Sequence, residues 1–192
     1  MSIEIRQGPV TVLEAYAGIP IAFEVREVLD VTVDPDGAFR LTARPLHRSY
    51  VKDYDTLGEG PTRWAERFDL STWGFFSAFS GGQCVGRAAV ATETPTLTML
   101  EGRNDLALLW DIRVARSARR GGIGSALFAA GVAWASSRGC RQLKVETQNV
   151  NVAACRFYAR HGCVLRAVNR GAYPELPEEI QLLWFKDLAH DS

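Results

Sequence analysis

The stretch best suited to chemistry is the run Arg119-Arg120-Gly121-Gly122-Ile123-Gly124. It follows an apolar, strand-like segment and opens a helix-like one. The first turn of a helix has unpaired N–H groups and the positive end of the helix dipole. Glycine lets a phosphate approach the backbone, and arginine matches the geometry of phosphate oxygens. The run therefore predicts a phosphate site, although not a Walker loop, because no Gly-Lys-Ser/Thr follows. The alternative is a flexible turn with two solvated arginines.

A second motif follows the glycine run. It reads Asn151-Val152-Ala153-Ala154-Cys155-Arg156-Phe157-Tyr158, then Gly162. With Arg119-x-x-Gly122-x-Gly124 after the strand Leu109–Val114, it resembles the acetyl-CoA signature of the Gcn5-related N-acetyltransferase (GNAT) family. The resemblance covers residues 106–185. It implies a GNAT (acyl-CoA N-acyltransferase) fold of the α/β class: a mixed, mostly antiparallel sheet with splayed central strands, flanked by helices.

The resemblance also implies acetyl-CoA as co-substrate, no metal, and a set of cofactor contacts. Ile112 and Val114 would use backbone groups on the pantetheine arm, and Asn151 would pair with that arm or cap its helix. The arginines 113, 116, 119 and 120 cluster without interleaved aromatic residues, which favours cofactor phosphate over nucleic acid. The full set implied is Ile112, Arg113, Val114, Arg119, Arg120, Gly121, Gly122, Ile123, Gly124, Ser125, Asn151, Ala154 and Tyr158.

Two side chains are candidates for proton transfer. Tyr158 lies at the usual acid position of the family, and a phenol with a pKa of about 10 arrives protonated and can donate to the leaving sulfur. A packed tyrosine with a paired hydroxyl is the alternative. Glu146 corresponds to the general base of the ribosomal-protein N-terminal acetyltransferases in the same family. A salt bridge to Lys144 or a neighbouring strand, or a water relay as base, is the alternative for Glu146.

Within the family, the chain is most similar to the streptothricin acetyltransferases through Glu146–Asn151 and the motif after it. The acceptor predicted is therefore the amine of a small cationic molecule, acetylated by direct transfer in a ternary complex. Asp111 either anchors a cationic substrate or satisfies a backbone donor, and Trp110 replaces the first member of the usual acidic pair. The substrate-binding candidates are Asp111, Trp110, Tyr173 and Tyr54, and the acids at 53, 55, 175, 178 and 179 either shape a cationic site or are solvated.

Two rival functions remain open. A protein N-terminal or lysine acetyltransferase would need a long, open peptide groove. A non-catalytic acyl-CoA-binding module would bind acetyl-CoA but release no thiol with any amine. The presence of both Tyr158 and Glu146 argues against the module.

Composition sets wider bounds. The 192 residues predict one domain over 1–192, with an acceptor-side half at about 1–100 and an acetyl-CoA-binding half at about 104–188. Twenty-two basic residues balance 22 acidic ones, which favours neither nucleic acid nor a membrane as partner. We find no signal-peptide pattern or membrane span. The four cysteines predict free thiols and a cytoplasmic location. A homodimer is compatible with the sequence.

The elements that must hold these groups follow from local patterns. The strands expected are 21–33, 38–43, 75–79, 84–91, 106–114, 142–147, 164–169 and 180–185, and the helices are 125–138 and 151–161. Asp34-Pro35-Asp36-Gly37 predicts a turn, Ser80–Gln83 a hairpin loop, and Gly139 a helix C-cap. Residues 45–67 predict a loop with a short helix.

Overall fold

The computed structural model describes residues 2–57 and 60–188, which form two compact units. The first unit consists of the described parts of Met1–Ala22, Asp53–Leu143 and Asp187–Ser192. The second consists of Phe23–Lys52 and Lys144–Lys186. Each unit is therefore assembled from stretches that are distant in the sequence.

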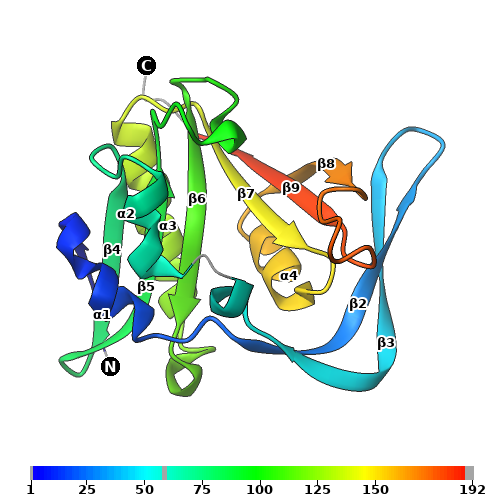
Figure 1. The fold of residues 1–192 in the computed structure, drawn as a ribbon, viewed down its shortest axis with the longest axis horizontal. Helices are drawn as coiled ribbons and strands as arrows, with labels where there is room; N and C mark the ends of the chain where they lie inside the picture. The colour runs from blue at the N-terminus through cyan, green and yellow to red at the C-terminus, as the bar shows by residue number, and fades with distance from the viewer. Residues whose placement is uncertain (1, 58–59, 189–192) are drawn as a thin grey trace. The chain divides into compact units, whose positions relative to one another are not determined.

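The first unit contains an antiparallel sheet in the order β1-β4-β5-β6. These strands are β1 (Ile3–Gly8), β4 (Gly74–Ser80), β5 (Gln83–Ala91) and β6 (Leu106–Val114). Helix α3 (Ile123–Ser137) packs on this sheet (Figure 1). The helix approaches β5 closely because Gly86 has no side chain: a Cβ there would lie 2.8 Å from Ile123 Cγ2. The predicted hairpin, β6 and α3 are confirmed, whereas β1 was not predicted.

Short helices and an aromatic cluster complete the first unit. Rings of Trp64, Phe68 and Trp73 lie with centroids 5.3–6.2 Å from that of Trp110 on β6. The edge of Tyr16 meets Trp64 with centroids 5.2 Å apart. The short helices are α1 (Leu13–Ala17), α2 (Trp64–Arg67) and the 3-10 turns η1 (Val10–Val12), η2 (Tyr54–Leu57), η3 (Pro61–Arg63), η4 (Thr98–Leu100) and η5 (Arg116–Ala118).

The second unit contains most of β7 (Gln142–Gln148) and β9 (Gln181–Asp187), with β9 between β7 and β8 (Val164–Asn169). Helix α4 (Val152–Arg160) follows β7. The patterns that predicted these three strands and this helix are confirmed within one or two residues. In a small core of this unit, Val150 packs with Val25 and Val28 of β2 (Phe23–Val33).

The ribbon is a long antiparallel pair, β2 (Phe23–Val33) and β3 (Phe39–Lys52), joined by the predicted turn at Asp34–Gly37 (Figure 1, blue and cyan). Gly37 supplies the positive φ of +85° that this turn needs. The prediction that β3 ends at residue 43 was wrong, as was the loop predicted for 45–52. The register shifts between Val25 and Glu27, so that Glu27 faces Pro45 and Val25 faces Tyr50. The pairing of β2 with β3 therefore resumes after Pro45. The sequence pattern gives no sign of this continuation. The short helix predicted within 45–67 is present as α2, and positions 58–59 lie outside the described residues.

The cysteines, the helix lengths and the clusters of possible metal ligands complete the description of the fold. All four cysteines are free thiols, as predicted. Within residues 2–57 and 60–188, no helix is long and apolar enough to cross a membrane. Over the same residues, no cluster of three or more His, Cys, Asp or Glu side chains could hold a metal ion.

Candidate functional site

The glycine run forms the turn between β6 and α3. Gly122 is the N-cap of α3 and has φ of +80°, a left-handed conformation that favours glycine. Arg120 also has a positive φ, of +67°. The first turn of the 15-residue helix α3 holds no acidic residue and no side-chain cap. Its N–H groups and dipole therefore face the turn without a built-in anion, which fits a phosphate ligand.

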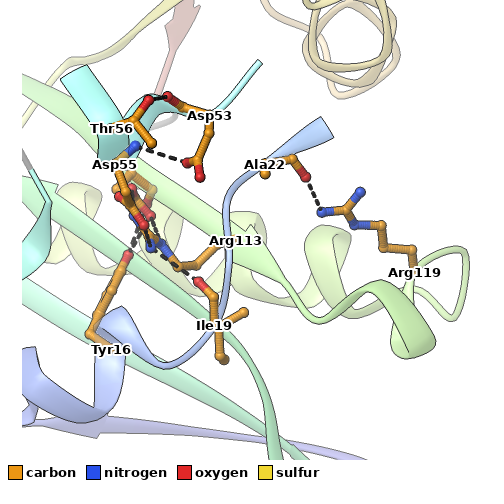
Figure 2. A network of polar contacts seen from close by, with 9 residues as sticks. Tyr16, Ile19, Ala22, Asp53, Asp55, Thr56, Arg113 and Arg119 are labelled. Atoms are coloured by element: carbon orange, nitrogen blue, oxygen red, sulfur yellow. Dashed lines mark hydrogen bonds and ion pairs between the residues drawn. The ribbon is translucent and has the colours of Figure 1, made fainter. Parts of the chain in front are cut away.

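Two exposed arginines border this turn. The Nε of Arg119 donates to the carbonyl of Val114 at 3.1 Å, and its Nη2 donates to the carbonyl of Ala22 at 3.2 Å (Figure 2). The first bond ties the start of the turn to the end of β6, and the second ties it to Ala22. In the described part of the chain, neither Arg119 nor Arg120 makes an ion pair, so both charges remain available for an anion.

Arg113 requires a correction. Its side chain is 1% exposed and bound to Asp55 and Asp111, so its guanidinium is not available to the cofactor phosphate expected from the sequence, whereas a backbone contact of Arg113 with the cofactor stays a prediction. Burial alone would lower the pKa of Arg113, yet the hydrogen bonds and charges of the two carboxylates hold it above its usual value. The guanidinium is thus a permanent internal cation.

Asp111 has two side-chain partners inside the first unit, and its predicted role as an anchor for a cationic substrate stays a prediction. Its carboxylate accepts from Arg113 and from the hydroxyl of Tyr16 at 2.9 Å. Burial and the negative charge of Asp111 raise the pKa of Tyr16 well above its usual value, so this hydroxyl stays protonated. The neighbouring Trp110 is an extra residue in β6: Ala89 faces Asp111, whereas Val90 faces Leu109. Such a bulge reorients the side chains around it.

The second unit brings together the candidate base and one predicted substrate residue. The hydroxyl of Tyr173 donates to Glu146 Oε1 at 2.5 Å. Gln148 Nε2 contacts the Tyr173 hydroxyl at 2.9 Å and Glu146 Oε1 at 3.4 Å. Glu146 is half-buried, and Lys144 is buried with its Nζ 5.3 Å from the centroid of the Phe185 ring. These contacts orient the Glu146 carboxylate.

Helix α4 places the second motif. Asn151 caps it, accepting from the N–H of Ala154 at 3.2 Å, so the predicted capping role is confirmed. Tyr158 is 4% exposed, and its ring meets Phe157 edge-on with centroids 5.2 Å apart. Cys155 is core, as expected, and burial raises its pKa to about 11.

The acids proposed to form a cationic site have different surroundings. Glu179 is buried and bound to Lys52, with 2.6 Å between Nζ and Oε1, so it is unavailable to a substrate. Asp55 is committed to Arg113. Glu175 and Glu178 are exposed, and Asp53 is half-buried beside Tyr54 in the first unit.

Sequence reasoning missed the residues that fasten these segments. Asn149 bonds both to Leu29 of β2 and to Ile180 before β9. Arg170 donates to the carbonyl of Val31 at 2.6 Å. Tyr16, Lys52 and Gln148 complete the set. Each acts on a partner far away in the chain, so no local pattern marks it; only the polar Asn149 directly after a strand offered a signal.

Comparison with known proteins decides the family. The model of the acetyltransferase (GNAT) family matches residues 42–163. The chain belongs to the GNAT family. It is 32% identical to streptothricin acetyltransferase A of Bacillus subtilis (strain 168) over 152 residues, which cover 78% of this chain and 80% of that protein. A streptothricin acetyltransferase of Escherichia coli is 28% identical over 169 residues, 85% of this chain and 84% of that protein.

A crystal structure supports the assignment to the GNAT family. A candidate streptothricin acetyltransferase from Bacillus anthracis str. Ames, solved in complex with acetyl coenzyme A, matches this GNAT chain with a TM-score of 0.79. The two are 25% identical, over 97% of this chain and 100% of the other. The predicted fold class is confirmed, and the protein is an acetyl-CoA-dependent N-acetyltransferase.

Proposed function

We propose that the enzyme acetylates an amine of a streptothricin-like cationic antibiotic. The observation that carries this is the likeness to streptothricin acetyltransferases over most of the chain, at 32% identity across 78% of it. The four free thiols are consistent with a reducing compartment such as the cytoplasm.

The glycine turn and its arginines would hold the cofactor. Gly122 and the first N–H groups of α3 accommodate a diphosphate, and Arg119 and Arg120 add charge beside it. Backbone groups of Ile112 and Val114 on β6, and the side chain of Asn151, are the proposed contacts for the pantetheine arm. Acetyl-CoA, when bound, supplies the activated acyl group.

Glu146 is the proposed base for the acceptor ammonium. The contacts from Tyr173 and Gln148 hold its carboxylate in one orientation. A positioned carboxylate that removes a proton, directly or through one water, contributes about 10²–10⁴-fold to such a reaction. Tyr173 would then act on the acceptor through Glu146 as well as by lining its site.

Tyr158 is the proposed acid. Its near-complete burial keeps the ring in one place, and a phenol carries the proton that a departing thiolate needs. With a separate acid and base, the amine can take the acetyl group directly in a ternary complex. In the first unit, Trp110, Tyr54 and Asp53 are the proposed acceptor contacts, because they combine an aromatic surface with a negative charge.

Thiol release from acetyl-CoA tests this proposal on a panel of amines: streptothricin, an aminoglycoside, a polyamine and peptides with free N-termini. We expect turnover with streptothricin and a fall of about 10²–10⁴-fold in kcat for Tyr158→Phe and for Glu146→Gln. The matched control is Tyr50→Phe, which removes a hydroxyl from a 42% exposed tyrosine on β3 and should retain full activity.

Other results point elsewhere. Turnover of peptides but not of streptothricin would identify a protein acetyltransferase. Binding of acetyl-CoA without thiol release from any amine would favour the non-catalytic module. A Tyr158→Phe variant as active as the Tyr50→Phe control would remove Tyr158 from the mechanism.

A further inference from the structure

The buried guanidinium of Arg113 joins three segments of the first unit (Figure 2). Its Nε and Nη2 bind Asp111 on the same strand at 3.0 and 2.6 Å. Its Nη1 and Nη2 bind Asp55 in η2 at 3.0 and 3.2 Å. Its Nη1 also donates to the carbonyl of Ile19, just after α1, at 3.0 Å.

These contacts use every donor of the side chain. A guanidinium has five N–H groups, and each of the five finds an acceptor here. Two of the groupings are bidentate forks onto carboxylates, a geometry that lysine cannot supply. Arg113 therefore has nothing left to offer a phosphate or an acceptor, and whatever it does for the reaction must act through its partners.

One of the segments that Arg113 holds is the turn η2, which it binds through Asp55. Within this turn, Asp53 Oδ1 accepts from the N–H of Asp55 at 3.1 Å, and Thr56 Oγ1 donates to the carbonyl of Asp53 at 2.8 Å. The turn is thus locally rigid. Asp55, 30% exposed, ties the turn to Arg113 on β6. Tyr54 lies between the two aspartates, so its position follows from this tie.

We propose that Arg113 is a positioning residue for the acceptor: by clamping Asp55, it holds η2, and with it Tyr54 and Asp53, in place to receive the cationic amine. This rests on the proposed function, which assigns Tyr54 and Asp53 to the acceptor. The Asp111 fork and the Ile19 carbonyl fix the guanidinium, and the Asp55 fork transmits that position to η2.

The test separates acceptor binding from cofactor binding. In Asp55→Asn the fork is lost, because an amide offers one acceptor where the carboxylate offered two. We expect the KM for streptothricin to rise about tenfold, while the KM for acetyl-CoA stays within about twofold. Arg113→Lys should also raise the KM for streptothricin. The control, Glu66→Gln, breaks an exposed ion pair with Arg63 in the same unit and should change neither constant.

Hydrogen exchange gives a measurement that needs no acceptor. Amides of residues 54–57 should exchange about tenfold faster in Asp55→Asn than in the wild type, and those of α3 should not change. Unchanged exchange in 54–57 overturns the proposal, as does an equal rise in both KM values. If the wild type rejects streptothricin, the proposed function fails, and the exchange result still decides whether Arg113 positions η2.

Discussion

Each unit of this GNAT enzyme contains a buried ion pair, and the two are built differently. In the first unit, Arg113 is 1% exposed and binds two carboxylates, one of them 30% exposed. In the second, Lys52 and Glu179 are 9% and 8% exposed and meet at 2.6 Å. Arginine offers a planar fork that can hold several groups in fixed directions, whereas an ammonium is a compact point charge.

The difference shows what each pair can do for its unit. The Arg113 cluster fixes the relative positions of three segments, because the partners lie just after α1, on β6 and in η2. The Lys52–Glu179 pair joins the end of β3 to the loop before β9. We therefore expect that apolar residues can replace the Lys52–Glu179 pair with little loss of stability, but cannot replace the Arg113 cluster.

The largest effect expected is from Arg113→Met. The variant leaves the carboxylate of Asp111, itself 7% exposed, without its cation, which should cost about 3–5 kcal/mol of unfolding free energy. Urea denaturation measures it. Arg113→Lys, which restores the charge but not the forks, should recover part of the loss. A cost below about 1 kcal/mol for the methionine variant would contradict the distinction.

Lys52→Met should come next. It leaves Glu179 buried without this cation, at a cost of about 3 kcal/mol. Adding Glu179→Met should bring stability back to within about 1 kcal/mol of the wild type, because an apolar pair can replace a buried ion pair. The same denaturation series measures this, and a double variant no better than the single one would show that this pair, too, is irreplaceable.

Tyr16→Phe tests the Arg113 cluster more gently. The variant removes the hydrogen bond to Asp111, worth about 1.5 kcal/mol at neutral pH. The native pKa of Tyr16 is raised, so above about pH 10 the unfolded chain loses this proton first and wild-type stability falls as pH rises. Phenylalanine has no such proton. Above about pH 10, the unfolding free energy of Tyr16→Phe should therefore fall less steeply with pH than that of the wild type, by up to about 1.4 kcal/mol per pH unit. Equal slopes in the two proteins would contradict the assignment.

The smallest effect expected is on the rate of thiol labelling at pH 8, which mass spectrometry measures. Burial raises the pKa of Cys155 and Cys163 in the second unit to about 11, so both should react more slowly than the half-buried Cys84. Lys52→Met should speed the labelling of Cys155 more than Arg113→Met does, since Lys52 belongs to the same unit as Cys155. Equal acceleration by both variants would mean that neither pair protects its own unit in particular.

The parts of the fold that could be predicted from the sequence are those set by neighbouring residues. The glycine turn, the bounds of β6 and the cap at Asn151 follow from contacts within a few positions. The roles of Arg113 do not, because its partners Asp55 and Ile19 lie 58 and 94 positions away. The sequence therefore identified Arg113 as a cation but not what it binds.

The same reasoning applies to the strands. Alternation revealed β2, but β3 continues past Pro45 only because its pairing with β2 resumes after an irregular stretch. Strand β1 was not predicted, and its partner β4 lies some 70 residues later in the chain. For Glu146, the sequence offered Lys144 as partner, whereas the structure supplies Tyr173 from a loop 27 positions away.

The ribbon also bears on how relatives of this enzyme can vary. It leaves the first unit after Ala22 and returns at Asp53, and near its tip Val33 is 61% exposed. Side chains alternate between the two faces of a strand, so inserting two residues into each strand near the tip would keep every residue on its face. One residue added to each strand would instead move the side chains of the new tip to the opposite face. Natural differences in ribbon length should therefore come in steps of four residues.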